Sequence, residues 1–161
     1  MPNDNVTPFR RPPRRPAAPQ QSGGLGLKTH RGKAVFSQVL TLIAFGVNFA
    51  IPFVLGASPF YTIGWIVGLG IAIAAGLFAY SNRGSSNPWA NTHHEHALRT
   101  LIIGWAIWTL GSLLGYVHGA LAVGTIFVQA LVALWAIVRA GIGAALAIMR
   151  KPVPNARGWL V

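Results

Sequence analysis

The chain has 161 residues, of which 53% are hydrophobic and only 9% are charged, and its formal net charge is +11. Soluble domains usually carry about 25% charged residues, so this composition excludes an ordinary water-soluble protein and indicates several membrane spans. The absence of cysteine excludes disulfides, thiolate metal sites and a cysteine nucleophile.

The first 33 residues form a basic, proline-rich segment. They contain most of the eleven prolines of the chain, and the stretch "RRPPRRPAAPQQSGG" lies within them. Because proline lacks an N–H group and little apolar surface is available to bury, we expect a disordered cytoplasmic arm over residues 1–33. Its clustered arginines suit anionic headgroups or an acidic protein surface; they are Arg10, Arg11, Arg14 and Arg15.

Four apolar segments follow, and each is long enough to cross the hydrocarbon core as a helix. They cover residues 34–55, 59–80, 96–117 and 120–149, and residues 150–161 form a tail. Very short links join the first segment to the second and the third to the fourth, which predicts two antiparallel hairpins. Asn48 and Pro52 leave a broken or re-entrant first helix as an alternative.

The basic residues predict the orientation. With the N-terminus in the cytoplasm, the arm, residues 81–99 and the tail lie on the same side, and the two outer links contain no lysine or arginine. This is the positive-inside pattern. We therefore expect an all-α integral protein of the bacterial inner membrane, with four spans and both termini cytoplasmic. The same distribution of charge argues against a nucleic-acid partner.

Arg139 is the basic residue that falls inside a predicted span. It lies towards the inner end of the fourth segment, where a long side chain can extend to the lipid headgroups. This interpretation is favoured. The alternative is an arginine that is paired inside a substrate path.

The stretch "NPWANTHHEHALRT", residues 87–100, is the most polar part of the membrane domain. Thr92 and Glu95 have the spacing of a capping box that would begin the third helix, and Glu95 precedes Arg99 by four residues, the favourable order for an ion pair. A metal site is the alternative interpretation, although this spacing is not that of a metalloprotease motif. Its ligands would be His93, His94 and His96. The structural interpretation is favoured, so we expect no metal or other cofactor.

The sequence shows no catalytic set. Asp4 and Glu95 are its two acidic residues, and Asp4 lies in the arm, which excludes acid–base catalysis by paired carboxylates. Phosphate-binding and dinucleotide-binding motifs are also absent. We therefore expect that the protein is not an enzyme.

Residues 64–161 resemble a family of small, uncharacterised predicted inner-membrane proteins of bacteria. The resemblance rests on "GLFAYSNR", on Trp89 and His93 followed by "ALRT", on "LWAIVRAGIGAAL" and on "KPVPNARGW". That family usually begins the next span with an H-x-x-x-Q-I-R-T-F motif, whose glutamine and aromatic residue are missing here. The family is distantly similar to an import component of the chloroplast inner envelope. The resemblance implies a membrane topology but no reaction.

These observations favour a non-enzymatic accessory or assembly subunit of a larger membrane complex. Besides membrane lipids, its expected partners are other integral membrane proteins or further copies of itself. Glycines four residues apart, such as Gly111 and Gly115, permit close helix packing. A small oligomeric channel or transporter is the second hypothesis, and a metal- or haem-binding membrane protein is the third.

Overall fold

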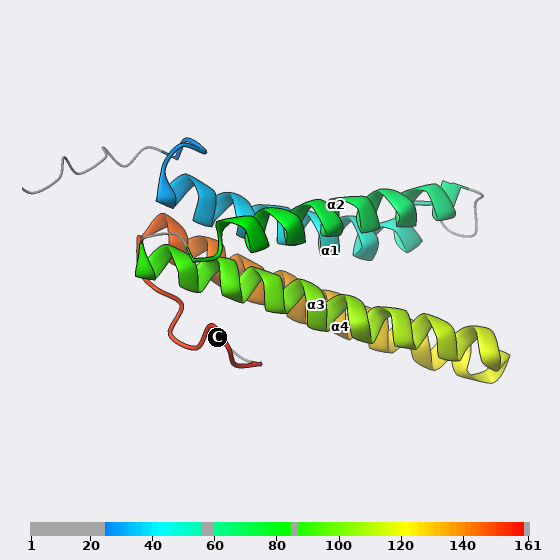
Figure 1. Ribbon diagram of the computed structural model, residues 1–161. Coiled ribbons are helices and arrows are strands. Elements are labelled where there is room, and N and C mark those ends of the chain that lie inside the picture. The colour runs from blue at the N-terminus through cyan, green and yellow to red at the C-terminus, as the bar shows by residue number, and fades with distance from the viewer. Residues whose placement is uncertain (1–24, 56–59, 85–86, 160–161) are drawn as a thin grey trace, which may run out of the picture.

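The computed structural model describes residues 25–55, 60–84 and 87–159. This part of the chain contains four long helices (Figure 1), namely α1 (His30–Leu55), α2 (Phe60–Asn82), α3 (Pro88–Val117) and α4 (Gly119–Ile148). Each is long and apolar enough to cross a membrane, which confirms the prediction of an all-helical protein with four helices that could span a membrane. The four clustered arginines of the predicted arm lie outside the described residues.

Two helices begin earlier than the sequence predicted. α1 begins one turn earlier, at His30, where the Thr29 hydroxyl accepts a hydrogen bond from the Gly32 N–H at 3.0 Å and satisfies one unpaired donor of the first turn. α3 begins two turns earlier, at Pro88. Proline suits the first turn because it has no N–H group to satisfy there. The polar stretch 87–100 is therefore mainly helical and not a loop.

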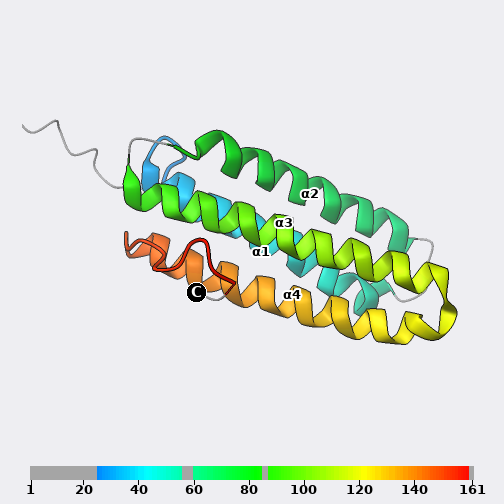
Figure 2. The ribbon, with the colours of Figure 1, turned by 60° about the horizontal axis from the view of Figure 1, so that its bottom comes forward.

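α1 and α3 are the two central helices of the bundle. Each packs against the other three, whereas α2 and α4 do not contact each other within the described residues. Figure 2 shows α2 and α4 on opposite sides of α3. Most of the core residues are alanines, which let the helix backbones approach closely. The largest core cluster contains Ala44, Phe45, Ala72, Ala75, Leu101, Val132 and Ala136.

Contacts between helix termini show which ends of the helices meet. Phe36 near the start of α1 packs edge-on against Phe78 near the end of α2, with ring centroids 5.0 Å apart. Phe78 also lies against His94 near the start of α3. His93 is bonded to the backbone of Lys151, just beyond α4. These four helix termini therefore lie together, and we call this end of the bundle the polar end.

α1 continues as a regular helix through Asn48 and Pro52, so the alternative of a broken first helix is wrong. The Asn48 amide donates to a backbone carbonyl one turn earlier and packs directly against Gly68 of α2, where a Cβ would have no room. At the next contact, a Cβ on Gly64 would lie 2.7 Å from the Ile51 Cδ1 atom. These two glycines therefore allow α2 to pack closely on α1.

A similar contact in the core generates a prediction. A Cβ on Gly104 of α3 would overlap the ring of Phe45, which is fully buried and packs against Trp105. Gly104→Ala should therefore lower the free energy of unfolding by about 1–3 kcal/mol, the usual cost of overpacking. Thermal unfolding in detergent measures the change.

Gly76→Ala in α2 is the matched control, because a Cβ there meets no atom within 4 Å. This substitution should leave stability unchanged or raise it by up to about 1 kcal/mol through helix propensity. Equal unfolding temperatures for the two variants would contradict the packing described for Phe45.

Candidate functional site

Polar side chains are concentrated inside the polar end of the bundle. α1 and α3 contribute several of them each, within one or two helical turns, and α4 contributes one. Buried polar groups destabilise a fold unless they are hydrogen-bonded, so the bonding of this cluster determines what it can do. We call it the polar cluster; its members are Ser37, Gln38, Thr41, His93, His94, His96, Thr100 and Arg139.

The Gln38 amide joins three helices. Its Nε2 atom donates to the His93 carbonyl at 2.9 Å and lies 3.3 Å from Nδ1 of His96. The other side of the amide packs against α4, where a Cβ on Gly143 would lie 2.6 Å from the Gln38 Oε1 atom. Because a backbone carbonyl only accepts hydrogen bonds, the amide nitrogen must face His93, which fixes the orientation of the amide.

This orientation determines the tautomer of His96. The Gln38 nitrogen is a donor, so Nδ1 of His96 must accept, and the neutral imidazole then carries its proton on Nε2. Nε2 is buried and has no hydrogen-bond partner among the described residues. The site therefore contains an unpaired N–H donor that points away from Gln38.

Arg139 does not extend to the headgroups, which corrects the favoured prediction. It is only 2% exposed, and its Nε atom donates to the Thr100 hydroxyl at 2.9 Å. Its Cζ atom lies 5.6 Å from the centre of the Trp135 ring, within cation–π range. The reason is helical phase, because Arg139 lies on the same face of α4 as the core residues Val132 and Ala136.

The rest of the Arg139 guanidinium group lacks hydrogen bonds. Its Nη1 and Nη2 atoms are buried and have no partner in the described part of the chain. Thr100, which accepts from Arg139, donates in turn to the His96 carbonyl at 2.7 Å. A line of hydrogen bonds thus joins α4 to the backbone of α3, while two strong donors stay unpaired.

The three histidines of the polar stretch turn to different partners. Nε2 of His93 lies 2.8 Å from the Lys151 carbonyl, His94 packs on Phe78 of α2, and His96 faces Gln38 of α1. Among the described residues, no group of three potential ligands is placed to hold a metal ion. Each histidine instead connects α3 to another part of the chain.

The predicted capping box is wrong, because Thr92 and Glu95 lie inside α3 and not at its first residue. The Thr92 hydroxyl donates to the Trp89 carbonyl at 2.7 Å and accepts from the Val153 N–H at 3.0 Å. The predicted pairing of Glu95 with Arg99 is confirmed at 2.7 Å, and Arg83 adds a second ion pair with Glu95 at 3.5 Å.

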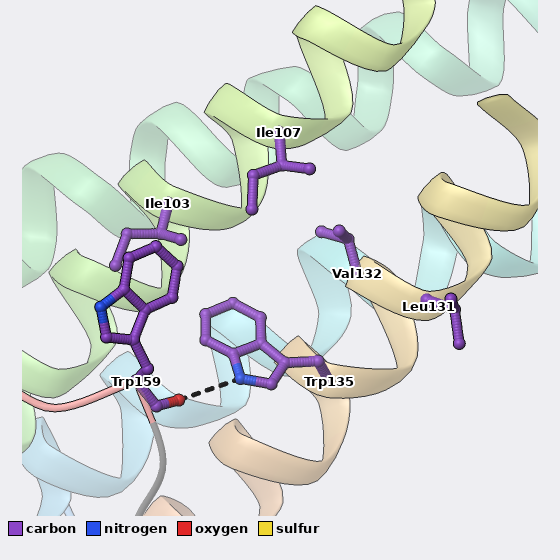
Figure 3. Close-up of a pocket in the computed structure, with 6 residues that line it drawn as sticks. All are labelled: Ile103, Ile107, Leu131, Val132, Trp135 and Trp159. Carbon is purple, nitrogen blue, oxygen red and sulfur yellow. Dashed lines mark hydrogen bonds between the residues drawn. The ribbon is translucent and has the colours of Figure 1, made fainter.

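The segment after α4 folds back along the bundle, which the sequence did not predict. Besides the contacts of Lys151 and Val153 with α3, the Trp159 carbonyl accepts a hydrogen bond from the Trp135 indole at 3.0 Å. Figure 3 shows the Trp159 ring beside Trp135 and Ile103. Trp159 and Trp135 border two grooves, of about 210 and 420 Å³, on the outer surface of α3 and α4.

No protein family, curated protein or solved structure matches the chain. The function must therefore be inferred from the site and the helices themselves.

The attachment of the tail generates a second prediction. Thr92→Val removes the acceptor of the Val153 N–H, a hydrogen bond worth about 0.5–1.5 kcal/mol, so the tail should detach more often. Because the chain has no native cysteine, Val153→Cys places a single, buried thiol whose rate of maleimide labelling reports detachment.

Labelling of the thiol should be about two- to tenfold faster in the Thr92→Val background, in proportion to the lost hydrogen bond. Thr109→Val, at an exposed position of the same helix, is the control and should leave the rate unchanged. If Thr92→Val also leaves the rate unchanged, Thr92 does not hold the tail.

Proposed function

We propose that this protein is a four-span protein of the bacterial inner membrane, arranged as two antiparallel hairpins with both termini in the cytoplasm. The distribution of charge supports this topology. Within the described residues, all lysines and arginines except Arg99 and Arg139 lie before or at the start of α1, around the α2–α3 link or after α4, and these two lie inside the first three or four turns from the polar end. A cytoplasmic polar end is the side that the positive-inside rule selects.

We further propose that the protein is a non-enzymatic accessory or assembly subunit of a larger membrane complex. The outer parts of α3 and α4, residues 109–131, carry this proposal. Of the residues in this range whose burial is described, Gly111 is the one that is buried. Nearer the polar end, the same two helices contain many buried residues. Figure 1 shows this part of the α3–α4 pair diverging from α1 and α2.

The surface of this outer part is suited to protein partners. Exposed large apolar residues occur on both helices, among them Leu110, Leu113, Leu114, Ile126, Phe127 and Leu131. Between the helices, Gln129 donates to the Ser112 hydroxyl at 2.8 Å, a kind of bond that joins membrane helices. Gly111 has room for a methyl group, since a Cβ there would meet only Gln129, at 3.9 Å. Close packing is therefore not needed at Gly111 within the chain, and the exposed apolar residues around it are available to a partner helix.

The acidic residues support a role without catalysis. Glu95 is the one acidic residue in the described part of the chain, and it is held by Arg83 and Arg99. A carboxylate whose two oxygens are each held in an ion pair is not free to accept a proton from a substrate.

The topology is tested by two single-cysteine variants of this naturally cysteine-free chain. Val117→Cys lies at the far end of the bundle and Pro154→Cys at the polar end, both at exposed positions. A membrane-impermeant maleimide added to intact spheroplasts should label the first and not the second. Labelling of Pro154→Cys alone would show the opposite orientation. Labelling of both variants would contradict four spans.

The partner surface is tested by photocrosslinking in native membranes. A photoreactive amino acid replaces Phe127 in the outer part or, as the control, Leu77 of α2, which is similarly exposed at 65% against 67%. Position 127 should crosslink to a discrete membrane protein or to a second copy, and position 77 to lipid. Lipid adducts alone at position 127, or the same adducts at both positions, would contradict an accessory role for this surface.

A further inference from the structure

The larger groove on the outer surface of α4 has one buried, charged residue in its wall. Its volume is about 420 Å³, which lies within the range of small-molecule sites. Arg139 contributes to its wall, and every other residue that lines it is apolar. These are Leu131, Leu134, Trp135, Val138, Ile142 and Trp159.

The charge of Arg139 has no counterion in the described part of the chain. Glu95, the one described acid, is already paired with Arg83 and Arg99, and the bond of Arg139 to Thr100 goes to a neutral hydroxyl. An uncompensated charge inside an apolar bundle is strongly destabilising. Because Nε is engaged, the paired Nη1 and Nη2 atoms stay available as a planar fork, the geometry that binds a carboxylate or phosphate through two oxygens.

We propose that this groove binds a single-chain amphiphile with a carboxylate or phosphate monoester head. The head would pair with Nη1 and Nη2 of Arg139, and the hydrocarbon chain would lie over Trp135 and the aliphatic residues of α4. The proposal does not depend on the accessory role. Most of the groove lies outside residues 109–131, which form the proposed partner surface.

The position of Arg139 in α4 agrees with this ligand. It lies nine residues before Ile148, the end of the helix, or about 13 Å at 1.5 Å per residue. Most of the apolar lining lies beyond Arg139, away from the polar end. A bound amphiphile would therefore have its head towards the polar end and its chain towards the bilayer centre, which is the orientation of a membrane lipid.

Trp159 provides a route for the head to reach the guanidinium group. It is the one lining residue outside the helices, and a hydrogen bond from the Trp135 indole to its carbonyl attaches it to α4. The Nη atoms are buried, so a ligand must displace a covering group. In this proposal Trp159 moves with the tail and widens the groove at Arg139, while the Trp135 ring, 5.6 Å from the Cζ atom, stays in place on α4.

The test measures ligand binding to the purified full-length chain by native mass spectrometry, with thermal stabilisation as a second readout. Four probes separate the head from the chain: oleate, oleoyl lysophosphatidate, uncharged oleyl alcohol, and inorganic phosphate or acetate without a chain. We expect oleate and lysophosphatidate to bind one per protein and to raise the unfolding temperature. Oleyl alcohol and the free anions should bind at least tenfold more weakly.

Three variants complete the test. Arg139→Met should weaken oleate binding at least tenfold while the protein still folds, because an apolar side chain replaces an uncompensated charge. Leu134→Trp, which fills the groove and keeps the charge, should weaken it to a similar extent. Arg99→Met removes an equal charge from the half-exposed surface of α3 and should bind as the wild type does.

Equal binding of oleyl alcohol and oleate would show an apolar groove without an anion site and would overturn the proposal. Equal stabilisation by free phosphate or acetate would show an anion site without a chain site and would also overturn it. Unchanged oleate binding in either Arg139→Met or Leu134→Trp would overturn it as well. Failure of the photocrosslinking experiment would not affect any of these outcomes.

Discussion

The polar end of this bundle depends on one buried amide. Gln38 bonds to the backbone and to a side chain of α3, and it lies against the backbone of α4. Inside an apolar bundle no water is available to replace these partners, so the amide and the helices around it must keep their relative positions. This one contact explains why residue 143 is a glycine, and why His96 must present Nδ1 to α1.

The polar cluster contains both unpaired donors and unpaired acceptors among the described residues. Ser37, Thr41 and Thr100 satisfy their hydroxyl groups on carbonyls of their own helices. The nitrogen atoms of His96 and Arg139 that have no partner among the described residues are donors. The Gln38 Oε1 atom is a buried acceptor that also lacks a partner among these residues. It is therefore the uncompensated charge of Arg139, and not a surplus of donors, that favours an anion in our proposal.

The sequence was sufficient for the helices, because an apolar run of about 20 residues has few alternatives to a helix in a membrane. The sequence did not predict the hydrogen bonds of side chains that can bond either to a nearby residue or to one far along the chain. The capping-box spacing of Thr92 and Glu95 was real, but the Thr92 hydroxyl bonds instead to Val153, 61 residues away. That contact depends on the path of the tail, which no local pattern reports.

Arg139 was misplaced for a different reason. Distance along the helix placed it near the membrane surface, but the direction of its side chain depends on helical phase, which it shares with Val132, Ala136 and Gly143. Because α4 is apolar on nearly every side, its sequence did not show which face points inward. Gln38 and Thr100, other members of the cluster, gave no such signal either, because isolated polar residues in apolar segments do not show which other helix they face.

The central claim is that Gln38 fixes His96 as a neutral imidazole with an unpaired proton on Nε2. Nitrogen-15 NMR of the protein labelled at its histidine rings, with His96→Phe to assign the signal, reads this state directly. We expect a protonated Nε2 and an unprotonated Nδ1 of His96 at neutral pH. The nitrogen-15 signals of this ring should change in Gln38→Leu. A proton on Nδ1, or a doubly protonated ring, would contradict the arrangement on which the polar cluster depends.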